Sequence, residues 1–330
     1  MKDTMQAYLL EGDADSFTAS VKSFSTADLP DEDVTIKVEY SSINFKDSMV
    51  NKGLGKMVRT FPHVPGIDLS GVVVSDRSGT FSEGDRVSLT GYEVGLGHFG
   101  GYSEYTRMPA DWVVKLPEGL STFEASALGT AGLTAMMAVM ALETNGVRPD
   151  QGPVLVTGAT GGVGAIAIEL LTRAGFEVTA GTGKADMHDL LKKLGAKALI
   201  SREEMVDDSP RVLLKEQWAG AVDQAGGNVL EYILRTTKTG GSVALTGNVA
   251  GNPFATTVLP FILRGVNLLG VDSQHFPMEK RQIAWDRLGG ALKPQHLKEI
   301  ATEITLEQLS EKLPEILGGG ARGRYVVKLP

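Results

Sequence analysis

The sequence predicts an α/β protein of two domains, the first rich in short strands and the second built on a doubly wound parallel sheet. Three observations support this fold class. The chain has 330 residues, enough for two hydrophobic cores. Short alternating strand patterns separated by turn signals fill roughly the first 125 residues. From Pro153 onward, apolar strands alternate with helical stretches, which indicates parallel strands joined by crossover helices.

Four short strands are predicted in the first domain. The clearest is Val34–Tyr40, in which apolar and polar side chains alternate with a period of two. Turn sequences such as Ser82–Asp85 separate the predicted strands of this domain. The other three predicted strands are 71–74, 85–89 and 112–116.

A long helix over 125–145, rich in Ala, Leu and Met, is predicted to lead into the second domain. A closing strand at 324–328, of the kind that pairs back into a first domain, is predicted to follow a short helix over 306–317. The strands expected between them are 153–157, 176–180, 197–200, 220–223, 241–246 and 266–271, and the helices are 165–174, 187–194 and 228–237.

Composition and charge narrow the classes of function. The formal net charge of −8 argues against nucleic acid or an anionic membrane as the main partner, because the overall field attracts neither polyanion. The chain has no cysteine, which excludes disulfides, cysteine-ligated zinc and a thiolate nucleophile. The N-terminus lacks the apolar run of a signal peptide, and no stretch approaches about 18 uninterrupted apolar residues. We therefore expect a cytoplasmic protein.

A glycine-rich turn after the strand Pro153–Thr157 carries the strongest functional signal. Gly161 and Gly162 let the backbone approach a pyrophosphate at a helix N-terminus, and Gly164 lets that helix pack on its strand. Ala159 replaces the first glycine of the usual motif, which is acceptable if its φ stays negative. We predict a dinucleotide site, with an ordinary strand–helix turn as the alternative. The turn residues expected to touch the cofactor are Thr160, Gly161, Gly162 and Val163.

The end of the second strand indicates which dinucleotide binds. NAD sites usually carry an acid there to bond the ribose hydroxyls, and that carboxylate would repel a 2′-phosphate. This chain instead has Thr182, Gly183 and Lys184, with Arg202 after the third strand. Lys184 supplies a positive charge for the phosphate, and Thr182 supplies a donor. We therefore predict NADPH, with a solvated surface position as the alternative for Lys184 and for Arg202.

Six motifs follow one another along the chain: SSINFKD at 41–47, PGID at 65–68, GTAGLTA at 129–135, TGATGGVG at 157–164, LPFILRGV at 259–266 and GVDS at 270–273. Together they resemble the medium-chain dehydrogenase/reductase superfamily over the whole chain. Within that superfamily the chain is most similar to the zinc-free quinone oxidoreductase branch of the YhdH/YhfP type, which includes NADPH-dependent acryloyl-CoA reductases.

The resemblance implies a metal-free site. Zinc-dependent members use a cysteine, a His–Glu pair and a later ligand, and the matching positions here are Asn44, Ile67–Asp68 and Thr130. Only Asp68 ligates readily, whereas a catalytic zinc needs about three protein ligands. The resemblance also implies a GroES-like catalytic domain at 1–128 and 274–330 and a Rossmann NADP-binding domain at 129–273.

The implied activity is NADPH-dependent reduction of an α,β-unsaturated thioester, acryloyl-CoA to propanoyl-CoA, by hydride transfer to the β-carbon. Asn44 and Thr130 are the polar candidates beside the nicotinamide, and Tyr92 is the candidate proton donor in a glycine-rich loop. The alternative for Asn44 is a turn cap, and for the Tyr92 loop a surface connection. An NADPH:quinone or enone reductase remains open, as does a non-catalytic NADPH-binding protein.

Further contacts follow from the same resemblance. Phe45 is expected to stack on the cofactor or the acyl group. The basic run Lys52, Lys56 and Arg59 is expected to meet the phosphates of CoA, with a solvated charged segment as the alternative. Since the strand 266–271 would expose an apolar edge, we expect a homodimer paired along it. The remaining expected cofactor contacts are Thr134, Thr246, Ser273 and Arg324.

Overall fold

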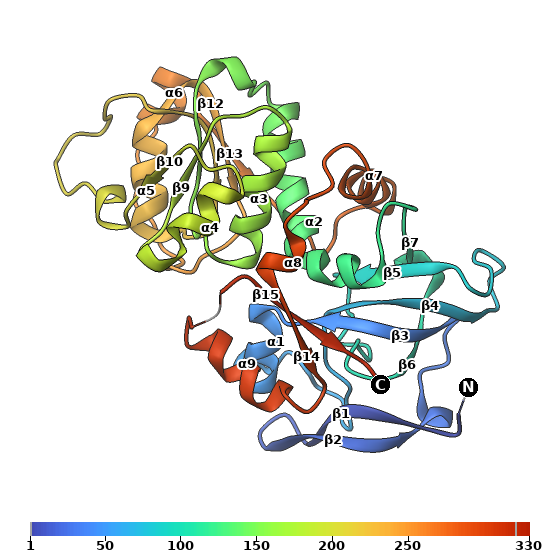
Figure 1. Ribbon diagram of the computed structural model, residues 1–330. Helices are drawn as coiled ribbons and strands as arrows, with labels where there is room; N and C mark the ends of the chain where they lie inside the picture. The colour runs from blue at the N-terminus through green and yellow to red at the C-terminus, as the bar shows by residue number, and fades with distance from the viewer. Residues whose placement is uncertain (1, 321) are drawn as a thin grey trace. The chain divides into compact units, whose positions relative to one another are not determined.

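The computed structural model describes residues 2–320 and 322–330 and divides into two compact units (Figure 1). Unit 1 comprises Met1–Thr130, Ser273–Ala291 and Leu297–Pro330, and unit 2 comprises Ala131–Asp272 and Leu292–His296. The predicted boundaries gave 292–296 to the first domain, whereas the structure groups this segment with unit 2. The reason is Glu169, a buried carboxylate that accepts hydrogen bonds from the Gln295 N–H and the His296 ring.

Unit 1 is built on a sheet of seven strands in the order β14-β15-β3-β4-β5-β7, with β6 paired to β3. The last strand, β15, pairs antiparallel with β3, which confirms that the chain returns to its first domain. A separate hairpin joins β1 and β2. The strands are β1 (Thr4–Gly12), β2 (Phe17–Ser25), β3 (Val34–Ser42), β4 (Asp68–Asp76), β5 (Arg86–Thr90), β6 (Tyr105–Met108), β7 (Val114–Lys115), β14 (Ala301–Thr305) and β15 (Arg324–Lys328).

Three strands of unit 1, besides β1, escaped the sequence prediction: two of them bury few residues and the third is very short. Strand β2 is rich in serine and has no fully buried residue. Strand β14 has one buried residue of five, and β6 is only four residues long. The predicted strand 112–116 shortens to β7 because Ala110–Trp112 forms a 3₁₀ turn. The helices of unit 1 are α1 (Phe45–Asn51), α7 (Met278–Gly289), α8 (Leu297–Ile300) and α9 (Leu309–Leu317).

Unit 2 is a parallel sheet of six strands in the order β10-β9-β8-β11-β12-β13. The predicted Rossmann architecture is therefore confirmed. The order reverses between β8 and β11, which places the dinucleotide switch point at their carboxyl ends. The strands are β8 (Val154–Val156), β9 (Val178–Gly181), β10 (Ala198–Ile200), β11 (Trp218–Asp223), β12 (Thr237–Leu245) and β13 (Asn267–Gly270); the helices are α3 (Gly162–Arg173), α4 (His188–Lys193), α5 (Gly227–Thr236) and α6 (Leu259–Arg264).

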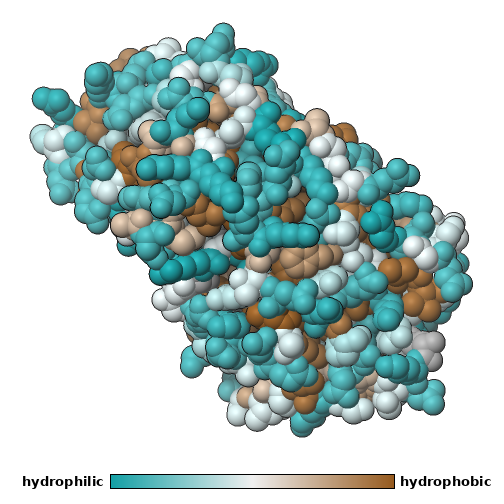
Figure 2. Space-filling view, viewed as in Figure 1, coloured by the Kyte–Doolittle hydropathy of each residue, from teal (hydrophilic) through white to brown (hydrophobic). Residues whose placement is uncertain are grey.

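Helix α2 (Thr122–Thr144) is the long helix that the sequence predicted. Its length and mean hydropathy of 1.6 would suit a membrane span, but 83% of its apolar window is buried within the protein. It is therefore a core helix. The backbone breaks at Gly129, whose φ of 48° and ψ of −148° are not helical, so a second helical segment begins at Thr130. The outer surface in the same view is mostly hydrophilic, with small separate hydrophobic areas (Figure 2).

Candidate active site

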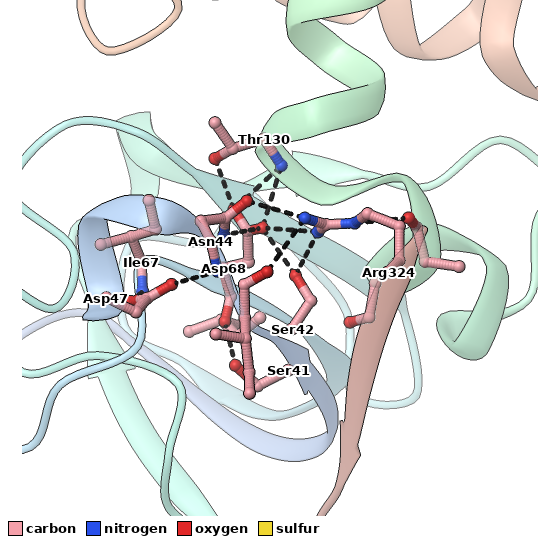
Figure 3. Close-up of polar contacts among 12 residues, drawn as sticks. Ser41, Ser42, Asn44, Asp47, Ile67, Asp68, Thr130 and Arg324 are labelled. Atoms are coloured by element: carbon pink, nitrogen blue, oxygen red, sulfur yellow. Dashed lines mark hydrogen bonds and ion pairs between the residues drawn. The ribbon is translucent and has the colours of Figure 1, made fainter. Parts of the chain in front are cut away.

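A cluster of buried polar side chains surrounds Asp68 in unit 1 (Figure 3). Strand ends bring its members together: β3 ends at Ser42, β4 begins at Asp68 and β15 begins at Arg324. Asn44 precedes α1, and Thr130 follows the break in α2. The cluster therefore joins positions up to 282 residues apart in the sequence.

The Asp68 carboxylate is the centre of this cluster. Its Oδ2 accepts from the Ser42 hydroxyl and the Asn44 amide, both at 2.7 Å. Its Oδ1 accepts from the Thr130 hydroxyl at 2.6 Å. The Thr130 backbone N–H lies 3.0 Å from both oxygens. Because Thr130 starts a new helical segment, this N–H has no carbonyl one turn earlier, and the carboxylate takes that place at the positive end of the segment.

Arg324 supplies the cation of the cluster, 3.4 Å from Asp68 Oδ2. It was predicted to touch the cofactor, but its N–H groups bond protein acceptors instead. Nε donates to Ala127 O, Nη1 to Ile43 O and Asn44 Oδ1, and Nη2 to Ser42 Oγ and Asp68 Oδ2. These five bonds use all five donors of a guanidinium. In the structure Arg324 thus neutralises Asp68 and orients Asn44, and its contact with the cofactor stays a prediction.

The Asn44 amide is fixed in one orientation by these two charges. Its oxygen accepts from Arg324 at 2.9 Å, while its nitrogen donates one N–H to Asp68 at 2.7 Å. Reversing the amide would set nitrogen against guanidinium and oxygen against carboxylate. The Asn44 side chain also interacts with the Asp47 carboxylate, and Asn44 is partly exposed. Asn44 is also the N-cap of α1, so the predicted turn cap and these side-chain bonds occur together.

Gly129 allows the cluster to close. A Cβ at this position would lie 2.3 Å from Asp68 Oδ2 and 2.8 Å from Arg324 Nη2, and the positive φ is itself unfavourable for other residues. Glycine is therefore required where the helix breaks, because the backbone passes directly over the ion pair.

A second carboxylate, Asp47, lies close to the cluster and is 1% exposed. It accepts the backbone N–H groups of Ile67 at 2.9 Å and Asn44 at 2.8 Å. Burial first, and then the negative charge of Asp68, raise the pKa of Asp47 to about 7. Asp47 therefore titrates near neutrality beside the Asp68–Arg324 ion pair.

Tyr92, the predicted proton donor, lies elsewhere in unit 1. Its ring stacks on Trp112 with centroids 5.3 Å apart, and the Arg281 guanidinium lies 4.6 Å from its centroid. Its φ of 50° is unusual for a residue other than glycine. Its hydroxyl forms no hydrogen bond within residues 2–320 and 322–330, so the structure does not join Tyr92 to the Asp68 cluster.

The predicted CoA-binding cations are all exposed. Lys52 and Arg59 flank a turn after α1, and Lys56 pairs with Asp15. Phe45, the first residue of α1, is 53% exposed beside Asn44. The cations and Phe45 remain predictions.

In unit 2 the predicted nucleotide residues gather around one cavity of about 230 Å³. Thr160 lines it from the glycine turn, Lys184 from the end of β9, and Arg202 from the end of β10. The turn takes its positive φ, 56°, at Gly158 and not at Ala159, which explains why alanine is tolerated there. Gly161 then precedes α3, which begins at Gly162.

Local contacts fix the structure at the end of this cavity where the 2′-phosphate is predicted to bind. The Lys184 N–H donates to the Thr182 hydroxyl at 3.0 Å. The Arg202 guanidinium carbon lies 3.6 Å from where a Cβ on Gly183 would be, so a side chain at Gly183 would crowd it. Two cationic side chains and a hydroxyl therefore line one end of the cavity. This arrangement suits a phosphate monoester.

The other predicted contacts, including Gly161 and Gly162, lie outside the cavity lining. Thr246 follows β12 and donates to Asp223 O at 3.1 Å, and Thr134 is buried in α2. Val163 is partly exposed in the first turn of α3, and Ser273 O accepts from Arg281 in unit 1. The lining residues missed by sequence reasoning are Met205, Val206, Ala225, Asn228, Val229, Val249 and Ala250. The available signal for part of this set was a second glycine turn, 226–227, after β11.

Two family descriptions match the chain. The alcohol dehydrogenase GroES-like domain matches residues 30–118, and the zinc-binding dehydrogenase domain matches residues 162–289. The second description names zinc, but no group of three or more metal-ligating His, Asp or Glu side chains was found in the part of the chain that the structure describes.

Relatives match over nearly the full length. The acrylyl-CoA reductase AcuI of Ruegeria pomeroyi is 47% identical over 309 residues, 94% of each chain. YhfP of Bacillus subtilis, whose name describes a quinone oxidoreductase, is 47% identical over 330 residues and 100% of each chain. Its structure with NAD bound covers 99% of this chain and 100% of its own, with a TM-score of 0.95. The YhdH oxidoreductase of Salmonella enterica in complex with NADP is 44% identical, with a TM-score of 0.94 and coverage of 99% and 100%.

Fold, nucleotide cavity and matches together define a two-domain oxidoreductase that uses a nicotinamide dinucleotide. The chain belongs to the medium-chain dehydrogenase/reductase superfamily, as its motifs predicted.

Proposed function

We propose that this protein reduces the C=C bond of a short 2-enoyl-CoA, such as acryloyl-CoA, with NADPH. The carrying observation is the Asn44 amide, which is held in one orientation by Asp68 and Arg324 and is partly exposed. Full-length relatives support the substrate class, since AcuI is named an acrylyl-CoA reductase. NADP in the YhdH structure supports the cofactor.

The residues of unit 2 fit this cofactor. The N-terminus of α3 and its glycine turn suit the pyrophosphate, and Lys184 and Arg202 suit the 2′-phosphate. A further sign of fit is a buried amide nitrogen of Gln224 without a partner in the described residues. When bound, NADPH supplies a hydride for the β-carbon of the acceptor.

Asn44 then acts on the acceptor. As the β-carbon is reduced, negative charge develops on the thioester oxygen, and a pre-oriented N–H lowers the energy of that charge. Arg324 and Asp68 are positioning residues, because each acts through the amide that it holds. The Thr130 hydroxyl donates a hydrogen bond to the Asp68 carboxylate and so helps to hold the same arrangement.

Steady-state oxidation of NADPH with acryloyl-CoA, crotonyl-CoA and a naphthoquinone tests the proposal. We expect turnover of at least one CoA ester with a specificity constant above that of the quinone. Fast quinone turnover without either ester would instead establish the quinone reductase, which the name of YhfP favours. Binding of NADPH without any turnover would favour the non-catalytic alternative.

An Asn44→Ala variant tests the role of the amide. Loss of one oxyanion donor is expected to lower kcat about 10²- to 10³-fold while the Kd for NADP⁺ stays within about twofold. Asn145→Ala, which removes an exposed amide bonded only to Ala141 O, is the control and should keep full activity. An Asn44→Ala enzyme with normal kcat would contradict the assignment.

The homodimer and the cytoplasmic location also remain proposals. Strand β13 ends the sheet of unit 2, and the neighbouring α6 segment exposes Val258, Ile262 and Leu263 at 63%, 68% and 61%. Pairing of β13 with its copy would cover this apolar area. Sedimentation velocity of the wild type, with Ile262→Glu as a dissociating variant, tests it; a monomeric wild type would contradict the proposal.

A further inference from the structure

Gln224 is a buried residue of unit 2 that neither the sequence nor the cavity lining assigned to the cofactor. It follows Asp223, the last residue of β11, and its side chain is 7% exposed. Strands β8 and β11 are neighbours where the order of the sheet reverses. Ligands of such sheets bind outside the carboxyl ends of the strands at this reversal. The Gln224 backbone therefore lies at the edge of the sheet where a dinucleotide would be expected to bind.

The backbone at Gln224 is tied to the end of β8. The Gln224 N–H donates to the Thr157 hydroxyl at 3.0 Å, and that hydroxyl donates to Asp223 at 2.5 Å. The Asp223 carboxylate also accepts the N–H groups of Ala225 and Gly226, each at 3.0 Å. The side chain of Gln224 thus projects from a fixed point.

The side-chain amide of Gln224 lies against the glycine turn. Its oxygen is 3.1 Å from the position that a Cβ on Gly158 would take, and 2.8 Å from that on Gly164. Both glycines belong to the turn and helix start expected to receive the pyrophosphate. The Gln224 amide therefore packs directly against the glycine turn, and a side chain at Gly158 or Gly164 would crowd it.

The amide nitrogen of Gln224 has no hydrogen-bond partner among the described residues, although it is buried. A buried donor without an acceptor destabilises the protein that carries it, so a ligand that supplies the acceptor would be bound more tightly. The bonds of the neighbouring backbone show that this part of the sheet is otherwise well paired.

We infer that Gln224 donates a hydrogen bond to the diphosphate of the bound dinucleotide. The amide reaches it by rotating about its last side-chain bond, a torsion that is broad for Gln. The inference rests on the proposed cofactor and not on the acceptor. Since NADP and NAD share the diphosphate, Gln224 serves both equally, in contrast to Lys184, which discriminates between them.

Gln224→Met keeps the length of the side chain and removes the unpaired donor. We expect the Kd for NADP⁺, NAD⁺ and ADP-ribose to rise together by about tenfold, the loss typical of a hydrogen bond to a charged group. The ligand-free variant should melt at the same temperature as the wild type or about 2 °C higher, because no buried donor remains unpaired. The control is Gln217→Met, since the Gln217 amide already donates to the Tyr232 hydroxyl at 3.1 Å. It should leave all three Kd values unchanged.

Each other outcome overturns the inference in a recognisable way. A lower melting temperature with unchanged Kd values would show a purely structural role. Weaker NADP⁺ with unchanged ADP-ribose would move the contact to the nicotinamide half. A wild type that binds none of the three nucleotides would overturn the cofactor proposal itself, and with it this inference.

Discussion

The Asp68 cluster and the nucleotide cavity differ in how completely their polar groups are paired. Around Asp68, all five guanidinium donors of Arg324 have protein acceptors, and the carboxylate accepts from four residues. At the glycine turn, the Gln224 amide nitrogen is buried without a partner among the described residues. The charged groups of the first site are thus paired within the protein, whereas the second site has a buried donor that a ligand would pair. Removing a residue should therefore destabilise the first site and weaken ligand binding at the second.

Breaking the ion pair should have the largest effect. Arg324→Met leaves the Asp68 charge buried without its cation, and we expect a loss of about 3–5 kcal/mol in the free energy of unfolding. Urea denaturation measures it. The double variant Asp68→Asn with Arg324→Met removes both charges and should recover part of the loss. A single variant as stable as the wild type would show that the cluster is not held by charge.

Closing the space over the cluster should have the next largest effect. Gly129→Ala sets a Cβ 2.3 Å from Asp68 Oδ2 at a positive φ, and we expect a loss of at least about 2 kcal/mol. Gly146→Ala is a matched control, because its φ is 85° but no atom lies within 4 Å of the added carbon. It should cost only about 1 kcal/mol. Equal losses for the two variants would mean that φ alone, and not the contact with Asp68, requires glycine.

At the nucleotide cavity a charge reversal should spare stability and change affinity. Lys184→Glu is expected to raise the Kd for NADPH at least about tenfold more than that for NADH, because only NADPH carries the 2′-phosphate. Fluorescence titration of both nucleotides measures the ratio. Lys197→Glu, at the opposite end of β10, is the control and should leave it unchanged. Equal weakening of both nucleotides by Lys184→Glu would refute the phosphate assignment.

The last prediction concerns the pH dependence of stability. Asp47 has a folded-state pKa of about 7 against an ordinary value of 3.8. Between these values the unfolded chain has lost the proton that the folded protein keeps, so stability falls as pH rises, by up to about 1.4 kcal/mol per pH unit. The penalty is fully present above pH 7 and absent below pH 4. Asp47→Asn should flatten the slope across this window, as measured by urea denaturation at several pH values; an unchanged slope would show that another group titrates.

Local patterns predicted most of unit 2. The strand–turn–helix unit, the strand after it and the residues Thr182, Gly183 and Lys184 are neighbours in sequence, and the structure keeps them together. The kink at Gly129 and the bonds of Arg324 were not predictable in this way. Arg324 meets Asn44 across 280 residues, and no periodicity records such a contact. The motif positions Asn44, Asp68 and Thr130 were identified, but their bonds to one another came only from the fold.

The Gln224 amide is a second feature that the sequence could not predict. A glutamine after a buried strand is an ordinary sequence feature. What distinguishes it is the absence of a partner among the described residues, a property of the tertiary packing around the turn. Residue type alone therefore predicted the charged end of the cavity, which Lys184 and Arg202 line, but gave no reason to single out Gln224.

The break in α2 also determines the electrostatics of the Asp68 cluster. Asp68 and Arg324 cancel as formal charges, and the helical segment that starts at Thr130 adds about half a positive charge at its N-terminus. With Asp47 protonated, the region is thus slightly positive before any substrate arrives. Negative charge that develops on a carbonyl oxygen bonded to Asn44 would therefore be stabilised by this positive potential. No ion or side chain would need to move.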